Sequence, residues 1–233
     1  MDTYDLRVRL SPALLVALPP ALSLVPVLDG LSLLWAGVAP VLVTCGGTYL
    51  LAQLARDAGK RIEPELYRSW GGTPTTQLLR HRGPAPQVAV AHRHAHLRRV
   101  LPQLPLPTPD QEAADPEAAD HAYETAVLAL RERTRNRQQH TLVFEENCSY
   151  GFRRNLLGLR AYGIVGAVVG LGLAAGSLVA EGQLGAGFSL SFVGAFLLDV
   201  VALGLWAFRV TSAWVEPYAH AYAERLLGAA EQL

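Results

Sequence analysis

The sequence predicts an all-α membrane protein, in which four transmembrane helices form two hairpins that flank a mainly helical cytoplasmic insert. Three observations lead to this fold class. Hydrophobic residues make up 51% of the chain and concentrate toward its two ends. Each end holds two long apolar stretches that are separated by a very short turn. The segment between the two pairs is polar and rich in arginine.

Each predicted span is long enough to cross the hydrocarbon core of a bilayer, which takes about 20 mainly apolar residues. Three of the stretches contain no charged residue, and the fourth contains one, Asp199. Four prolines interrupt the first stretch, and each removes a backbone donor and favours a kink. The second stretch follows so closely that we interpret the first as a retained helix rather than a signal peptide. The four stretches are residues 10–28, 30–55, 161–180 and 182–208.

The basic residues predict the orientation, because cytoplasmic flanks of membrane helices carry an excess of Arg and Lys. The two turns expected outside hold only Asp29 and Glu181. Both termini and the insert are therefore expected on the cytoplasmic side of the membrane. Cys45 and Cys148 are not expected to pair in that reducing compartment. The flanks expected inside hold Arg7, Arg9, Arg56, Lys60, Arg61, Arg153, Arg154, Arg160 and Arg209.

The chain is expected to divide into four parts. Residues 1–55 form the first hairpin, 56–160 the sensor or partner-binding insert, 161–210 the second hairpin and 211–233 a C-terminal amphipathic helix. Within the insert, Thr73 before Pro74 and Asp115 before Pro116 are N-cap signals that start helices. The other expected elements are a continuation of the second span over 56–70, a short helix to about residue 82, a basic helix over 88–101, a proline-rich linker over 102–109, a helix from 116 and a short strand over 141–144.

The segment after residue 67 is the most suggestive candidate site. Glycines followed by a capped helix start present free N–H groups, which suit an anion, and arginines add bidentate phosphate contacts. The alternative is a tight turn with an ordinary cap, and the Gly-Lys-Ser/Thr core of a P-loop is absent. The candidate ligand-binding residues are Arg68, Trp70, Gly71, Gly72, Thr73, Thr75, Arg80 and Arg82.

Asp199 is the candidate functional residue inside the membrane, because a carboxylate at mid-span is costly and normally faces the bundle or a watery path. A pore, a proton relay and a structural partner such as Thr44 or Thr48 remain open. The third span carries two small-xxx-small pairs, which permit close helix contact. These pairs are Gly166/Gly170 and Gly172/Gly176.

Two further groups have simpler interpretations. Aromatic and arginine side chains directly before the third span are expected to anchor it at the headgroups; they are Tyr150, Phe152, Arg153 and Arg154. His92 and His96 lie four residues apart and could share a metal on a helix. No carboxylate or cysteine lies at a companion spacing, so no metal site is predicted and a solvated basic face is favoured.

The runs WGGTPTTQLLRHR and NCSYGFRRNLLGLR resemble those of a family of bacterial four-helix membrane proteins, to which no particular activity is attached. The layout of two hairpins around an insert is also similar to the four-transmembrane effectors of nucleotide-signalling anti-phage defence systems. That similarity lies in topology and covers the whole chain. It implies an oligomeric effector that lies in a bacterial inner membrane and perturbs it.

The expected function is therefore a membrane effector of anti-phage defence, whose insert senses a phosphate-bearing ligand or a partner protein. The expected partners are membrane lipids, a second copy of the chain, and a cytoplasmic protein or nucleotide. Direct binding of nucleic acid is not expected. A non-enzymatic scaffold that recruits a cytoplasmic partner is the alternative, followed by a small transporter. Nucleophile-elbow, HExxH, kinase, Walker and Rossmann motifs are absent from the sequence, so neither an enzyme nor a cofactor is expected.

Overall fold

The computed structural model describes residues 4–24, 46–183 and 189–233, and the regular elements in these ranges are all helical. The all-α prediction is therefore confirmed for this part of the chain. The predicted strand over 141–144 is wrong, because these residues start the helix α8 (Thr141–Gly158). A four-residue apolar run cannot by itself distinguish a strand from a helix, and the described residues offer it no neighbouring strand.

The chain forms two compact units. The first comprises the described parts of residues 1–62 and 151–214, and the second comprises residues 63–150 and 215–233. The divisions fall inside three helices, namely α3 (Gly47–Ser69), α8 and α11 (Ser212–Gly228). The borders expected from hydropathy, after residues 55, 160 and 210, lie 4 to 10 residues away from these divisions, because each of these helices continues from one unit into the other.

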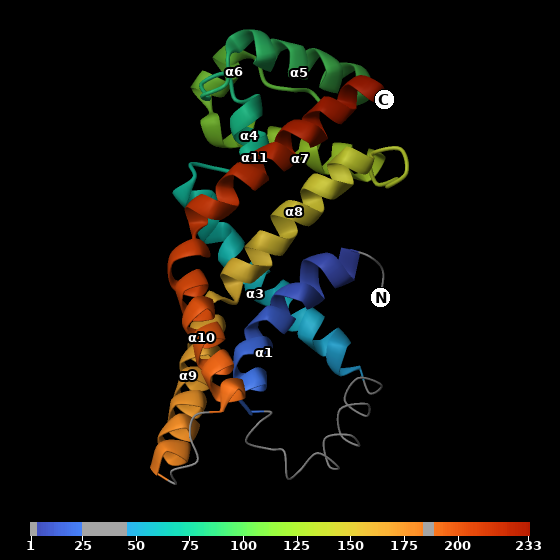
Figure 1. The fold of residues 1–233 in the computed structure, drawn as a ribbon. Helices are drawn as coiled ribbons and strands as arrows, with labels where there is room; N and C mark the ends of the chain where they lie inside the picture. Colours follow the sequence, from blue (N-terminus) through green and yellow to red (C-terminus); the bar gives the residue numbers. More distant parts are fainter. Residues whose placement is uncertain (1–3, 25–45, 184–188) are drawn as a thin grey trace. The chain divides into compact units, whose positions relative to one another are not determined.

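The first unit is built around three helices, α1 (Ser11–Leu24), α9 (Arg160–Gln183) and α10 (Leu190–Gly204). α1 packs against both α9 and α10, which also pack against each other (Figure 1). The π-helical turns η1 (Asp5–Leu10) and η3 (Leu205–Arg209) precede α1 and follow α10. The guanidinium of Arg160 donates to the carbonyl oxygens of Trp206 and Ala207, at 3.1 and 2.7 Å, and so satisfies acceptors in this last turn.

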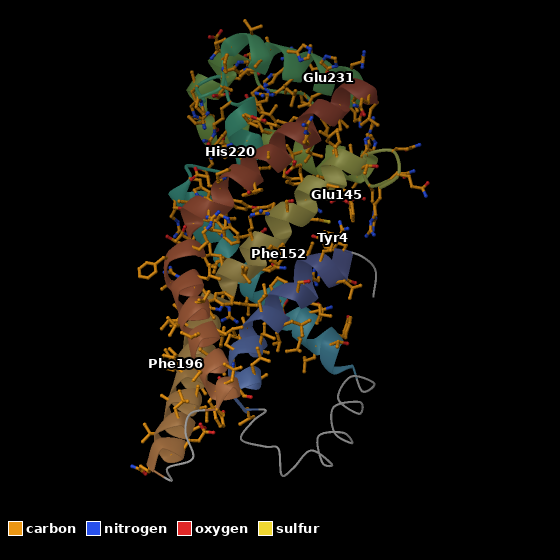
Figure 2. The ribbon with its side chains drawn as sticks, viewed as in Figure 1. Tyr4, Glu145, Phe152, Phe196, His220 and Glu231 are labelled. Carbon is orange, nitrogen blue, oxygen red and sulfur yellow. The ribbon has the colours of Figure 1, made fainter. Side chains whose placement is uncertain are left out.

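Two helical segments in the described residues, Arg160–Gln183 and Leu190–Arg209, are long and apolar enough to cross a membrane. The described residues bury only 22% and 17% of their apolar windows, and Figure 2 shows the side chains that project from these helices. The first two predicted spans are described only in part, as α1 and the beginning of α3. Residues 25–45, which include Pro26 and Thr44, lie outside the described residues.

The second unit has its own apolar core. The helices that build it are α4 (Pro74–Leu79), α5 (Gln87–Val100), α6 (Pro109–Ala114), α7 (Pro116–Arg133) and the larger part of α11, followed by η4 (Ala229–Gln232). The largest core side chains include Leu79, Leu97, Tyr123, Leu130 and Leu226, all at most 1% exposed. The predicted amphipathic helix at the C-terminus is therefore part of the insert, where Leu226 and Leu227 complete the core.

Local signals explain where these helices begin. Thr73 accepts a hydrogen bond from Thr76 N, and Asp115 accepts one from Ala118 N, as the N-cap signals predict. The helix α6 was not expected; it begins at Pro109, the last residue of the predicted proline-rich linker. It begins with a capping box, in which Thr108 and Gln111 satisfy each other's backbone N–H groups.

Candidate functional site

The Gly-Gly segment is a closed turn between α3 and α4. Gly71 and Gly72 have φ values of +82° and +128°, a region that side chains with a Cβ rarely adopt. The Gln77 amide donates to the carbonyl oxygens of Trp70 and Gly72, both at 2.8 Å, and so ties the turn to α4. A Cβ on Gly72 would lie 2.7 Å from Nη2 of Arg80. The turn therefore requires glycine for both its conformation and its packing.

The two arginines that follow the turn are engaged inside the insert. Arg80 makes a bidentate pair with Asp120, with Nε–Oδ1 at 2.8 Å and Nη2–Oδ2 at 2.7 Å, and its Nη1 donates to Gly71 O. Arg82 donates to Asp120 at 3.0 Å and pairs with Glu112 at 3.0 Å. The hydrogen bond to Asp120 raises the pKa of Arg80. Burial alone would raise the pKa of Asp120, but the two arginines outweigh this effect and lower the pKa.

Glu112 is the buried centre of this network, with 1% of its surface exposed. Its Oε2 accepts from His81 N at 2.9 Å and from the Tyr123 hydroxyl at 2.6 Å. Its Oε1 accepts from Arg82 N at 2.9 Å as well as from the Arg82 guanidinium. Burial alone would raise its pKa, but these hydrogen bonds lower it. Burial and the bond to Glu112 raise the pKa of Tyr123. The carboxylate therefore joins α4, α6 and α7.

His94 on α5 is a second buried polar residue in this region. Its Nε2–H donates to Leu79 O at 2.8 Å, and its Nδ1 has no hydrogen-bond partner among the described residues. Its ring lies edge-on to His81, at 4.6 Å between ring centroids, and 5.5 Å from the Tyr123 ring. Burial lowers the pKa of His94, since the cationic form would lose solvation.

The candidate ligand-binding residues therefore separate into two groups. Arg80 and Arg82 point into the insert, and Thr73 and Thr75 face each other, with 3.2 Å between their hydroxyl oxygens. Arg68 lies on the surface, where it pairs with Glu65 and its side chain is 75% exposed. α4 is only six residues long. Asp120 lies 40 residues from Arg80, and Glu112 lies 30 residues from Arg82, so no local sequence signal indicates either pair. The capping box at Thr108 could have placed Glu112 on a helix, but it does not identify the partner.

Asp199 lies in the first unit and is fully buried. The Ser23 hydroxyl donates to its Oδ2 at 2.6 Å, and its Oδ1 has no hydrogen-bond partner within the described ranges. A Cβ on Gly170 would lie 2.7 Å from Cγ of Asp199, so the absence of a side chain makes room for the carboxyl. Ser23 on α1 was not considered from the sequence. Of the two threonines that were, Thr44 lies outside the described residues, and Thr48 makes no hydrogen bond to Asp199 among them.

The glycines of α9 differ in what they face. Gly166 lies against α1, where a Cβ would be 3.1 Å from Val16 O, and Gly170 faces Asp199. Gly172 and Gly176 meet no described atom within 4 Å. Sequence reasoning missed Gly163, on which the Trp206 ring lies. Together with Gly170, it belongs to the buried small-residue face of α9, whose 4-3-4 spacing was the available signal.

The residues expected at the headgroups are largely packed within the chain. Tyr150 is 6% exposed, lies 3.1 Å from the Tyr67 hydroxyl and stacks on Tyr222. Phe152 packs beside the cluster of Leu156, Trp206 and Val210. The Arg153 guanidinium lies over the Trp214 ring, 5.2 Å from its centroid. Their role as membrane anchors stays a prediction.

Arg154 belongs to a buried polar contact in the first unit. Arg154 is 7% exposed, and its guanidinium donates to Asn155 Oδ1 at 2.8 Å. The Asn155 amide donates to Val8 O at 2.8 Å. Gly158 is so close to α3 that a Cβ would lie 2.5 Å from the backbone of Ala58. This part of α8 therefore serves close helix packing, which the sequence analysis did not predict.

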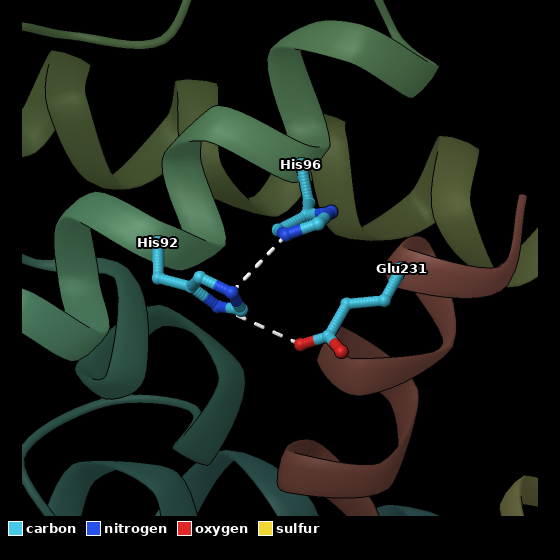
Figure 3. Close-up of side chains that lie close together, drawn as sticks. All are labelled: His92, His96 and Glu231. Atoms are coloured by element: carbon cyan, nitrogen blue, oxygen red, sulfur yellow. Dashed lines mark hydrogen bonds and ion pairs between the residues drawn. The ribbon is translucent and has the colours of Figure 1, made fainter.

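The insert also brings three potential metal ligands together. His92 and His96 face each other on α5, and Glu231 on η4 approaches His92 (Figure 3). The carboxylate missing at a nearby sequence position is thus supplied by a residue far along the chain.

Comparisons with protein-family models, curated proteins and solved structures find no match.

Proposed function

We propose that the chain is a membrane-embedded effector, with the first unit in the bilayer and the insert acting as the receiver of a cytoplasmic signal. The exposed apolar side chains support the membrane location. They cover the outward surfaces of three helices packed together, where a soluble protein would leave a large apolar area in water. Examples are Leu14 and Leu18 on α1, Val165 and Val168 on α9, Leu197 and Val201 on α10, and Phe208 on the following turn η3, all 45% exposed or more.

The arginine distribution supports the proposed topology of four spans with both termini and the insert in the cytoplasm. Arg160 and Arg209 border the two long apolar helices at one end. At the other end, Glu181 near the end of α9 accepts a hydrogen bond at 2.8 Å from N of Ser189, the residue before α10. Basic residues at one end and a single acid at the other agree with a hairpin inserted from the cytoplasmic side.

Asp199 is the observation that carries the effector proposal. A carboxyl at the centre of a membrane helix costs about 2.5–3.5 kcal/mol on insertion scales, and Ser23 is its hydrogen-bond partner in the described residues. An ionisable residue inside a membrane helix is therefore by default a candidate for function. In an oligomer that forms through Gly172 and Gly176 of α9, Asp199 places a polar group inside the membrane. That group can disturb the packing of lipids or let ions cross.

Membrane potential in living cells provides the test. Cells that carry the chain and are infected with phage are expected to depolarise, and Asp199→Asn should reduce the response at least tenfold at equal expression. Ser191→Ala, at an exposed position of the same helix, is the matched control and should respond like the unaltered chain. Full polarisation during both infection and strong overexpression would refute the effector proposal. The setting of anti-phage defence rests on the topological resemblance.

A cytoplasmic partner protein is better supported as the signal than a phosphate-bearing ligand. Arg80 and Arg82 already have carboxylate partners in the insert, so a phosphate would have to displace Asp120 or Glu112. Equilibrium binding of labelled nucleotides to the purified chain tests this point. Saturable binding that Arg68→Ala abolishes would favour the ligand instead.

The alternative function, a non-enzymatic scaffold, is favoured by one feature of the insert. Its internal ion pairs and continuous apolar core make it a structural module of its own. Co-purification of a stoichiometric cytoplasmic protein, together with full function of the Asp199→Asn variant, would support the scaffold over the effector.

A further inference from the structure

We propose that His92, His96 and Glu231 form a binding site for a divalent transition-metal ion of the zinc class, which joins α5 to the C-terminal segment of the insert. The three side chains each offer one ligand atom, and these atoms lie within 4.8 Å of one another. All three residues belong to the second unit. Figure 3 shows the two imidazoles turned toward each other, with the Glu231 carboxylate beside them.

The spacing of the two histidines fits one ion. Their Nε2 atoms are 3.2 Å apart. A tetrahedral zinc ion with Zn–N bonds of about 2.0–2.1 Å places two ligand nitrogens about 3.3–3.4 Å apart. In the absence of metal, the two nitrogens can share one hydrogen, with one Nε2–H donating to the other nitrogen. An ion can replace that hydrogen with only a small movement of the rings.

Glu231 distinguishes this site from a simple pair of surface histidines. Its Oε1 lies 3.5 Å from Nδ1 of His92, and its side chain is 50% exposed. That nitrogen is not the one that faces His96, so the carboxylate has to turn in order to reach an ion at the two Nε2 atoms, and its exposure permits this turn without disturbing the core. Two imidazoles and one carboxylate leave a fourth position for water, as in open zinc sites.

The fold holds the two parts of the site at a defined separation. Leu97 on α5 and Ala230 on η4 belong to the same apolar cluster. Arg99 Nη2 donates to Glu231 O at 3.4 Å, which attaches the backbone of this turn to α5. The nearby guanidinium also repels a cation. His96 Nδ1 has no hydrogen-bond partner among the described residues. Metal sites that lack such outer contacts bind about 10–100-fold more weakly, so we expect a reversible site rather than a permanent structural one.

The ligand set defines which ions should bind. Imidazole suits Zn²⁺, Cu²⁺ and Ni²⁺, whereas Mg²⁺ and Ca²⁺ prefer sites made of oxygen ligands. An ion bound here would link residues that are 139 positions apart in the sequence. It would therefore reduce local opening of the segment 229–232, because binding to the closed form alone stabilises that form.

Zinc titration of the full-length chain tests the proposal. The chain should be purified in detergent through an affinity tag without histidines, stripped of metal, and titrated with Zn²⁺ against a chromophoric chelator. We expect one Zn²⁺ per chain and slower hydrogen exchange at 229–232 when zinc is bound. His96→Ala should abolish both effects. Glu231→Gln should lower the affinity at least tenfold and remove the exchange protection.

A second histidine–glutamate pair supplies the control. His121 and Glu124 lie 3.8 Å apart on the exposed face of α7, and the described residues do not add a third ligand to this pair. His121→Ala should leave zinc binding and exchange unchanged. Equal binding by the Glu231→Gln variant, or the same exchange protection from Mg²⁺ as from Zn²⁺, would overturn the proposal.

Discussion

Replacement of Glu112 by glutamine tests whether the network of α4, α6 and α7 stabilises the insert. Either orientation of the new amide places an NH₂ group where an oxygen now accepts two hydrogen bonds. If it replaces Oε2, the Tyr123 hydroxyl can rotate to accept, but His81 N–H loses its acceptor. If it replaces Oε1, both the backbone N–H and the guanidinium of Arg82 lose theirs. At least one partly buried donor is therefore left unsatisfied.

The size of the effect follows from these contacts. An unsatisfied buried donor costs about 1–3 kcal/mol. Loss of the ion pair adds less than the 3–5 kcal/mol found for fully buried pairs, because the Arg82 side chain is 39% exposed. We expect the Glu112→Gln variant to lose about 2–4 kcal/mol of insert stability. For a unit of about 100 residues, that loss lowers the melting temperature by on the order of 10 °C or more.

Hydrogen exchange measured by mass spectrometry on the full-length chain gives the stability of the insert directly, through the opening free energy of the segments 74–82 and 109–123. Glu117→Gln removes the charge of an exposed glutamate at the beginning of α7 and is the matched control. Its effect should stay within about 0.5 kcal/mol. Equal exchange in the two variants would refute the assignment of Glu112 as the centre of a stabilising network.

Acid should destabilise the insert in two steps. The pKa of His94 is lowered by burial, so the unfolded chain binds its proton first and stability falls as the pH drops below about 6.5. The pKa values of Glu112 and Asp120 are also lowered in the folded state, so a second loss of stability begins below about pH 4.5. Hydrogen exchange of the insert from pH 8 to 4 measures the first loss of stability and the pH at which it begins. Stability that is constant down to pH 5 would contradict this first loss. In the first unit, Gly158→Ala should lower stability by about 1–3 kcal/mol, since the new methyl group overlaps the backbone of α3. Gly172→Ala, which meets no described atom within 4 Å, should be neutral or stabilising in the same thermal unfolding assay in detergent, and equal melting temperatures would contradict the predicted overlap.

The sequence predicted helices where the signal is local. Thr73 with Pro74 and Asp115 with Pro116 start helices in the structure, because a cap depends only on residues within one turn. The long apolar runs likewise predicted α9 and α10. The capping box at Thr108 was an equally local signal for α6, but the surrounding prolines suggested a linker.

The contacts between distant segments could not be predicted. Arg80 was interpreted as a phosphate ligand from the glycines and the helix start beside it. Its partner Asp120 lies 40 positions away, and a single sequence does not indicate which carboxylate an arginine meets. The same limit applied to His92, for which no companion carboxylate was found near in sequence. Glu231 is 139 positions from His92, and only the packing of η4 against α5 brings the two together.

The place of α11 in the insert has a consequence for how the chain is made. A ribosome releases residues 63–150 long before Leu226 and Leu227, which complete the apolar core of that unit. The insert must therefore wait, incompletely folded, until both long apolar helices of the first unit have been synthesised. The insert therefore completes its fold only after α11 has emerged from the ribosome. A soluble version of the insert would need residues 215–233 joined to residues 63–150.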